Sequence, residues 1–307
     1  MNRRDFLGRL LAGGVCAAMS GCIGPFGRSR KKFSLNASSI RGYGLDLRAQ
    51  VEAAIAGGFT GFEPWLKDVH AAKAAGTLKD AVAAARDGGL EFVNAIAFGR
   101  WVDPDPAIRA EGLEETKRDM DVLAEMECPL IAACMFGVHK PGSPHVENKA
   151  IAERFEAVCE LGRKTGVKPL LEYWGHSVNM NTAEATLDVL AMVKPEDAAI
   201  LADVYHTYRG GGSFETYRRF GGNLLPVLHV NDYPGTPPRE QLVAADRVWP
   251  GAGLAPWRKI FEYLDEAGAD PWLSIEVFNP NYWKTTPVQT SKEGYEWLDR
   301  TYALRSR

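Results

Sequence analysis

From residue 33 onward, eight short apolar segments alternate with stretches in which apolar residues recur at helical spacing. The predicted strands cover residues 33–37, 60–65, 91–98, 129–134, 168–172, 199–203, 225–230 and 272–277. The predicted helices cover residues 46–57, 77–86, 105–127, 146–165, 182–193, 213–220, 254–267 and 290–304. Regular alternation of strands and helices is typical of a parallel sheet covered by helices.

The number of repeats selects among parallel sheets. Eight strand–helix pairs favour a closed (β/α)8 TIM barrel, which takes about 250 residues as one domain. An open doubly wound sheet would show the same local pattern, but no Gly-x-Gly-x-x-Gly follows the first strand, as it does in dinucleotide-binding sheets. We therefore predict an α/β fold with a single TIM barrel over residues 33–307.

The N-terminus has the features of an export signal. A twin arginine at positions 3 and 4 precedes Phe-Leu and a weakly apolar run over residues 10–19, which is too short for a permanent membrane helix. This pattern predicts a twin-arginine signal peptide over residues 1–22 and a periplasmic location. The segment Met-Ser-Gly-Cys that ends at Cys22 resembles a lipoprotein processing box. A lipid anchor at Cys22, followed by a tether over residues 23–32, is therefore a further expectation.

Composition excludes some classes of partner. The chain has a net charge of −3 with 24 % charged residues, so it lacks the basic surface that nucleic-acid binding requires. Beyond the N-terminal run there is no second long apolar segment. Cys128, Cys134 and Cys159 lack Cys-x-x-Cys spacing, and we expect buried thiols rather than a zinc knuckle or a disulfide framework.

Four successive strands carry an ionisable residue near their carboxyl ends. These residues are Glu172, Asp203, His229 and Glu276. The carboxyl ends of barrel strands meet at one mouth, where the active sites of TIM barrels lie. Three carboxylates would repel one another there unless a cation bound them. The sequence therefore predicts a divalent metal site, and its oxygen-rich ligands suit Mn²⁺, Mg²⁺ or Co²⁺ better than a thiolate-rich zinc site would.

The segments around these four residues resemble the metal-site motifs of the xylose isomerase-like superfamily. They are Leu170-Leu171-Glu172, Ala202-Asp203-Val204-Tyr205-His206, Leu228-His229-Val230-Asn231-Asp232 and Ser274-Ile275-Glu276. Pro250-Gly251-Ala252-Gly253 likewise resembles the family's turn after strand seven. The superfamily includes ketose 3-epimerases, hydroxypyruvate isomerases, inosose dehydratases and 3-keto-glycoside lyases. The resemblance covers residues 33–304, and it is specific for fold and metal rather than for substrate.

The resemblance also implies roles for individual residues. Glu172 and Glu276 would bind the metal and move protons through a metal-stabilised enediolate of the substrate. His206, three residues after Asp203, would contact a substrate oxygen. Glu63, at the end of strand two, would lie near the substrate.

Residues on the loops are further candidates for substrate binding. Asp232 and Arg247, after strand seven, are either an orienting pair or a surface salt bridge. His176 is a candidate acid, base or substrate contact. Tryptophans that could stack on a sugar ring fall just beyond strand ends, namely Trp65, Trp101, Trp174 and Trp283. The ketose 3-epimerases carry a second glutamate shortly after the ligand on strand five, and this chain has Tyr-Trp-Gly-His there instead.

The leading interpretation is a metal-dependent isomerase or epimerase that acts on a non-phosphorylated sugar or keto-sugar. Export argues against sugar phosphates as substrates, and no Gly-rich phosphate cradle follows strand seven or eight. The alternative is a metal-dependent lyase or dehydratase of the 3-keto-glycoside or inosose type, which the missing second glutamate favours. A non-catalytic sugar-binding lipoprotein ranks below both, because Glu172 and Glu276 are both present. A phosphodiesterase related to endonuclease IV ranks low, because it would need more histidines to bind three zinc ions. As for partners of the chain, a homo-oligomer is left open.

Overall fold

Eight short parallel strands form one sheet in the computed structural model, which describes residues 31–306. The strands are β1 (Phe33–Asn36), β2 (Gly61–Glu63), β3 (Glu91–Phe92), β4 (Leu130–Ala133), β5 (Lys168–Glu172), β6 (Ile200–Asp203), β7 (Val227–Val230) and β8 (Trp272–Ile275). Their order in the sheet is β3-β2-β1-β8-β7-β6-β5-β4. Consecutive strands therefore lie side by side, except that β3 and β4 stand at the two ends of this order, and β1 also pairs with β8.

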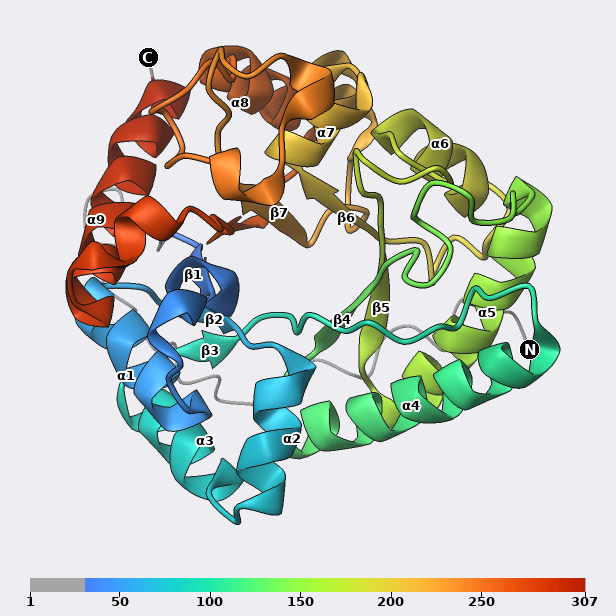
Figure 1. Ribbon diagram of the computed structural model, residues 1–307, viewed down its shortest axis with the longest axis horizontal. Coiled ribbons are helices and arrows are strands. Elements are labelled where there is room, and N and C mark those ends of the chain that lie inside the picture. The colour runs from blue at the N-terminus through green and yellow to red at the C-terminus, as the bar shows by residue number, and fades with distance from the viewer. Residues whose placement is uncertain (1–30, 307) are drawn as a thin grey trace, which may run out of the picture. The chain divides into compact units, whose positions relative to one another are not determined.

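Backbone hydrogen bonds just beyond β3 connect the two ends of this strand order. The N–H of Ala95 donates to the carbonyl of Leu130 at 3.2 Å, and the N–H of Ala132 donates to the carbonyl of Ala95 at 2.9 Å. These bonds join the β3 segment to β4, and the helices surround the strands (Figure 1). The predicted single-domain TIM barrel is confirmed.

The described α-helices are α1 (Leu47–Gly57), α2 (Leu66–Ala74), α3 (Leu78–Asp87), α4 (Pro106–Glu125), α5 (Asn148–Thr165), α6 (Ala183–Leu190), α7 (Val204–Gly210), α8 (Trp257–Ala267) and α9 (Pro287–Tyr302). All except α2 and α7 begin and end close to predicted positions. Side chains of Asp46, Asp105 and Thr182 cap three of the N-termini by accepting backbone N–H groups. The carboxyl ends of α1 and α5 close on Gly58 and Gly166, whose left-handed φ angles of 96° and 81° favour glycine.

Two helices were not predicted, and one predicted helix is wrong. α2 and α7 are short and lie in segments assigned to loops. α7 begins directly after β6 because the carboxylate of Asp203 caps it, accepting the N–H of His206 at 2.7 Å. Residues 213–220 contain only a 3₁₀ helix, η2 (Phe214–Arg219). Its Ser213 cap gives a helix-like start, but the following Gly221-Gly222 ends it within two turns.

The third strand is much shorter than the predicted range of 91–98. Beyond Phe92, the chain bonds alternately to neighbours on both sides. The N–H of Val93 donates to Phe62, that of Ala95 to Leu130 and that of Ile96 to Pro64. The segment therefore keeps an extended course without forming a regular ladder with either neighbour.

Alternation along the strands aims the ionisable residues into the barrel. Leu170, Leu201 and Val227 belong to a buried cluster separate from the main core. Side chains two residues apart in a strand share a face. Glu172, Asp203 and His229 follow these three residues by two positions, so they point to the same interior near the carboxyl ends of their strands.

Several expectations concern the chain outside the barrel. Residues 1–30 lie outside the described residues. They include the predicted signal over residues 1–22, Cys22 among them, and all of the predicted tether except residues 31 and 32. None of the described helices has the length and hydropathy to cross a bilayer. Cys128, Cys134 and Cys159 are free and buried, as predicted.

Candidate metal and active site

Three of the four predicted ligands converge at adjacent strand ends. Asp203 lies opposite His229 in the β6–β7 pair, and Glu276 directly follows β8. One potential ligand atom of each lies within 4.8 Å of the others. The Nδ1 of His229 is 3.4 Å from Oε2 of Glu276 and 3.8 Å from Oδ2 of Asp203. All three side chains are buried, and their ligand atoms face one common point.

Glu63 fixes the orientation of His229 from the opposite side. The Nε2 of His229 is 3.1 Å from a carboxylate oxygen of Glu63, so this nitrogen donates. In the neutral ring, Nδ1 is then a buried acceptor, and it has no hydrogen-bond partner among the described residues. Burial disfavours protonation of His229, but Glu63 and Glu276 raise its pKa well above the usual range. Nδ1 therefore holds either a proton or a cation, as metal-binding histidines do.

Glu63 itself is fully buried and does not line the cavity described below. Its carboxylate accepts the side-chain amides of Asn36 at 3.2 Å and Asn94 at 2.7 Å, as well as the hydroxyl of Ser274. Burial would raise the pKa of Glu63, but His229, Ser274 and Asn94 lower it. The expectation that Glu63 lies near the substrate stays a prediction, and the structure places Glu63 against His229. The sequence offered a signal for Ser274. It lies in β8 two positions before Glu276, and side chains at that spacing in an extended chain point to the same face.

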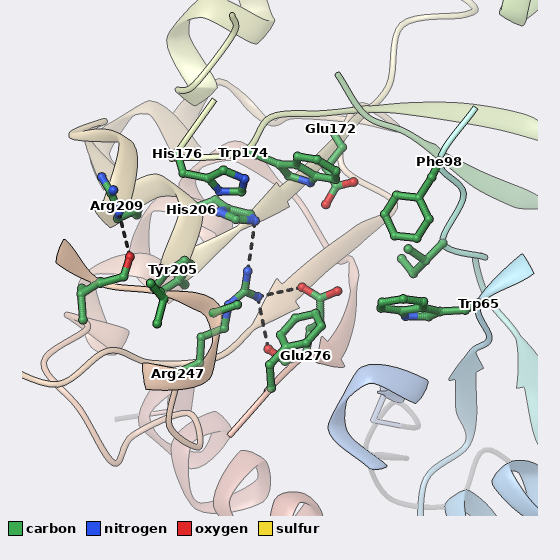
Figure 2. Close-up of a pocket in the computed structure, with 15 residues that line it drawn as sticks. Trp65, Phe98, Glu172, Trp174, His176, Tyr205, His206, Arg209, Arg247 and Glu276 are labelled. Carbon is green, nitrogen blue, oxygen red and sulfur yellow. Dashed lines mark hydrogen bonds and ion pairs between the residues drawn. The ribbon is translucent and has the colours of Figure 1, made fainter. Parts of the chain in front are cut away.

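Glu172, the fourth predicted ligand, is not part of the three-residue cluster. It is buried and lines the cavity described below (Figure 2). Burial raises the pKa of Glu172 to about 8, against the attraction of His229 and together with repulsion from Glu276. The structure thus brings Glu172 to the same mouth, and its role as a metal ligand stays a prediction.

Arg247 lies in the floor of the site. Its Nη1 donates to Oδ2 of Asp203 at 3.0 Å and to Oε2 of Glu276 at 2.7 Å, and the residue is 2 % exposed. Burial alone would raise the pKa of Glu276, but His229 and Arg247 lower it to about 2. Burial raises the pKa of Asp203 despite Arg247. The guanidinium therefore neutralises part of the buried negative charge and orients both carboxylates.

Asp232 holds the loop after β7 instead of pairing with Arg247. Its carboxylate accepts the backbone N–H groups of Gly251 and Ala255 and the indole N–H of Trp257, each at 2.9 Å. Within residues 31–306, Asp232 and Arg247 form no ion pair with each other. The expected orienting pair or surface salt bridge is therefore wrong. The Pro-Gly-x-Gly turn folds over Asp232 so closely that a Cβ at Gly253 would lie 2.4 Å from its Oδ1.

A cavity of about 500 Å³ opens onto this cluster. Figure 2 shows Glu172, Glu276, His206 and Arg247 around it. Its lining residues are Trp65, Ile96, Phe98, Glu172, Trp174, His176, Tyr205, His206, Arg209, Leu242, Val243, Ala244, Arg247, Glu276 and Phe278. The structure thus places the predicted substrate contacts His206, His176 and Trp174 at the cavity. Glu63 and Asp232 are absent from its lining.

Both cavity histidines are neutral near pH 7. Burial and then the charge of Arg247 lower the pKa of His206 well below its usual range. Its Nε2 is 3.0 Å from Nη2 of Arg247. Desolvation, followed by His139 and Arg247, lowers the pKa of His176 to about 4. Nδ1 of His206 accepts the backbone N–H of Gly175 at 3.1 Å, so both nitrogens of this ring already have partners. The neutral ring of His176 can offer a lone pair, and it stacks against Trp174 with a centroid distance of 5.6 Å.

The four tryptophans that follow strand ends divide into two groups. Trp65 and Trp174 line the cavity, as stacking residues would. Trp101 is buried against Phe155, and Trp283 donates its indole N–H to the carbonyl of Ser39. The lining also contains the aromatic residues Phe98, Tyr205 and Phe278, none of which was predicted as a substrate contact.

The buried imidazole–carboxylate cluster lies at the carboxyl-terminal mouth of a parallel barrel. TIM-barrel enzymes have their active sites at this mouth. The family model of the xylose isomerase-like TIM barrel matches residues 51–301 of this chain. The chain belongs to that family, and the resemblance of its strand-end motifs is confirmed.

Two relatives of similar sequence are inosose isomerases. That of Bacillus velezensis is 29 % identical over 161 residues, which cover 51 % of this chain and 57 % of the relative. That of Bacillus subtilis is 26 % identical over 187 residues, which cover 60 % and 65 %. This chain therefore aligns with somewhat less than two thirds of the length of either relative.

Solved structures of other proteins share the fold. An IolI protein with a bound zinc atom matches with a TM-score of 0.78 and 20 % identity, over 89 % of this chain and 98 % of that one. The D-psicose 3-epimerase of Clostridium cellulolyticum H10 has a TM-score of 0.72 and 18 % identity, over 89 % and 99 %. The probable 3-DHS dehydratase AsbF of Bacillus anthracis has a TM-score of 0.70 and 18 % identity, over 87 % and 98 %.

Proposed function

We propose that this chain is a divalent-metal-dependent isomerase or epimerase of a non-phosphorylated sugar or keto-sugar. The observation that carries the proposal is the convergence of Asp203, His229 and Glu276 in a buried cluster, together with a cavity that Glu276 and Glu172 both line. The names of the inosose isomerases and of D-psicose 3-epimerase support the same reaction class.

The donor set fits a divalent cation. Nδ1 of His229 is a buried acceptor without a partner among the described residues, and it faces two carboxylates. Asp203, His229 and Glu276 would hold the ion, with Glu172 as the proposed fourth ligand. Three carboxylates and one imidazole suit Mn²⁺, Mg²⁺ or Co²⁺. When bound, such an ion polarises a carbonyl and so acidifies the neighbouring C–H group.

The two cavity glutamates differ in basicity. Glu172 has a pKa raised to about 8, so its carboxylate is the stronger base and its carboxyl is an effective donor near neutral pH. Glu276, held ionised by His229 and Arg247, has a pKa of about 2. We assign the main proton transfer at the substrate carbon to Glu172. Glu276, as a carboxylate, can accept a proton on the other side, and it keeps Arg247 in place.

Proton exchange with solvent tests this assignment. The protein, supplied with Mn²⁺, is incubated in D₂O with fructose or a keto-inositol, and NMR measures deuterium at the carbon next to the carbonyl. We expect exchange to fall by about 10²-fold or more in Glu172→Gln. The exposed Glu114→Gln serves as the matched control and should retain exchange. Equal exchange in wild type and Glu172→Gln would contradict the role of Glu172, and no exchange with any keto-sugar would contradict the proposed function.

The difference in pKa between Glu172 and Glu276 also favours a second candidate function, that of a lyase or dehydratase. Elimination needs one strong base to remove the proton, whereas epimerisation also needs a donor on the opposite face. Among the described residues that line the cavity, Glu172 alone combines a carboxyl group with a raised pKa. An unsaturated or cleaved product would identify this reaction, and an unaltered carbon skeleton would identify the isomerase.

We further propose that the protein works outside the cytoplasm, exported by its twin-arginine signal. The support is the sequence at positions 3–19. Cell fractionation tests it: the wild-type chain should appear in the periplasmic or membrane fraction, and a variant with Arg3→Lys and Arg4→Lys should stay in the cytoplasm. Labelling with radioactive palmitate, lost in Cys22→Ala, would establish the lipid anchor.

A further inference from the structure

The cavity has two chemically different parts. Its floor is polar and contains Glu172, Glu276, His206 and Arg247. Its outer wall is an aromatic arc formed by Phe278, Trp65, Phe98 and Trp174 (Figure 2 labels all but Phe278). Neighbouring rings of the arc have centroid distances of 6.4, 5.2 and 6.2 Å, so the four side chains form one continuous surface.

The aromatic arc offers no free polar group to a ligand. The indole N–H of Trp65 donates to Oγ of Ser38 at 2.9 Å, and the Trp174 side chain hydrogen-bonds Glu172. The lining also contains four aliphatic side chains, Ile96, Leu242, Val243 and Ala244, and three further polar ones, His176, Tyr205 and Arg209. Val243 is 57 % exposed, although large apolar side chains of the described barrel are mostly buried. The aromatic arc itself can therefore bind apolar groups but cannot pair hydroxyl groups.

The size of the cavity exceeds that of one sugar ring. A hexose has about 12 non-hydrogen atoms and fills roughly a third of the 500 Å³ at the packing density of protein interiors. A second sugar in the remaining space would place several hydroxyls against aromatic and aliphatic groups. Each buried hydroxyl without a partner costs about 1–3 kcal/mol. A flat apolar group in that space leaves no polar atom unpaired and stacks on the aromatic arc.

We propose that the natural substrate is a sugar or keto-sugar that carries an aryl substituent, with the sugar at the polar floor and the aryl group on the aromatic arc. This inference rests on the proposed function, since it places the reacting sugar carbon beside Glu172 and Glu276. It narrows the substrate class from free monosaccharides to aryl glycosides.

Binding of simple glucosides to the full chain tests the inference without requiring turnover. Phenyl and methyl glucosides of both anomers are titrated, and the tryptophan fluorescence of the protein or the heat of binding is followed. We expect a phenyl glucoside to bind about tenfold or more tightly than the methyl glucoside of the same anomer, from burial of the phenyl ring. Phe98→Leu and Val243→Ser should each reduce that ratio, while methyl glucoside binding changes little.

Val178→Ser provides the matched control, because Val178 is also exposed, at 48 %, and lies outside the cavity lining. It should leave the phenyl-to-methyl ratio unchanged. Equal affinity for the phenyl and methyl glucosides, or no saturable binding of the phenyl glucosides, would overturn the inference. If proton exchange on free keto-sugars persisted in that case, the proposed function would stand without it. Tight binding of phenyl glucosides without proton exchange on any keto-sugar would instead contradict the isomerase function and support the aryl-binding site.

Discussion

At the scale of the residue, the most informative side chain is His229, because its two ring nitrogens have different contacts. Nε2 donates to Glu63, and Nδ1 faces Asp203 and Glu276. A buried carboxylate of this kind sets the tautomer and raises the basicity of the ligating nitrogen. Glu63 would therefore act on the proposed metal through His229, as a positioning residue.

Replacing Glu63 by Gln keeps the volume and removes the charge. We expect the dissociation constant for Mn²⁺ to rise by about 10–100-fold, the usual effect of losing such a partner. Metal titration followed by calorimetry measures it. Glu114→Gln, an exposed change of the same type, should bind Mn²⁺ like the wild type. If Glu63→Gln is folded and binds Mn²⁺ with unchanged affinity, Glu63 has no part in the site.

At the scale of the element, strand ends were the most predictable part of the molecule. β5 has the predicted bounds, and β6, β7 and β8 differ only at their margins, because apolar runs bounded by polar residues are a local signal. The ionisable residues could therefore be placed at strand ends from the sequence alone. α7 was missed because it begins without a loop, at a side chain that had already been assigned to the metal.

A buried glycine in α4 gives a prediction about packing. A Cβ on Gly112 would lie 2.5 Å from the backbone carbon of Arg100 and 2.8 Å from the nitrogen of Trp101. In an exposed helix, Gly→Ala stabilises by up to about 1 kcal/mol. Here we expect Gly112→Ala to lower the free energy of unfolding by roughly 1–3 kcal/mol, because backbone atoms cannot move aside. Urea unfolding measures it, and a stabilised Gly112→Ala would show that α4 shifts freely.

The exposed Ala110 in the same helix is the control. Ala110→Gly should lose about 1 kcal/mol through helix propensity alone. If both changes cost stability, although they run in opposite directions, the close contact at Gly112 rather than propensity decides its effect.

Glu184 connects α6 to η2 and predicts a dependence of stability on pH. Its carboxylate accepts the N–H of Ser213 at 3.1 Å and the hydroxyl of Thr216. Burial would raise its pKa, but the hydrogen bond from Thr216 and those from the backbone lower it below 4.5. A lowered pKa in the folded state means that the stabilisation is complete above pH 4.5 and is lost as the pH falls through the folded value.

Thermal unfolding of Glu184→Gln should therefore show a loss of about 1 kcal/mol at pH 7. The difference from the wild type should shrink as the pH falls below 4.5 and through the lowered pKa of the folded state, where Glu184 takes up a proton. Glu215→Gln, next to the same 3₁₀ helix, is an exposed control. A difference that stays constant from pH 7 down through this range would show that the charge of Glu184 does not matter.

At the scale of the whole molecule, contacts that depend on loops escaped prediction. Arg247 was predicted as a site residue, but its contacts with Asp203 and Glu276 were not, because only the fold of the long loop after β7 brings it there. Asp232 has the sequence position of a site residue, but its bonds to backbone N–H groups make it the residue that shapes this loop. Long-range contacts of this type have no local periodicity, so sequence patterns could not assign them.

The balance of buried charge predicts how the whole barrel responds to metal. Asp203, Glu276 and Glu63 lie in one buried cluster, in which His229 and Arg247 are the only counter-charges from residues 31–306, and Glu172 lies close by. A ligand that binds only the folded state stabilises it by about 2.7 kcal/mol at a hundred times its dissociation constant. For a domain of this size each kcal/mol shifts Tm by roughly 2–4 °C.

We therefore expect a chelator to lower Tm of the purified protein by about 5–10 °C, and added Mn²⁺ to restore it. The double variant Glu172→Gln/Glu276→Gln should contain no metal and should unfold at a temperature that neither chelator nor Mn²⁺ changes. Elemental analysis of both proteins separates loss of metal from loss of structure. If the wild type contains no metal and its Tm ignores chelator and Mn²⁺ alike, the charges of Asp203 and Glu276 are satisfied by Arg247 and protonated His229 alone. The cavity would then be a binding site rather than a metal-dependent catalytic one.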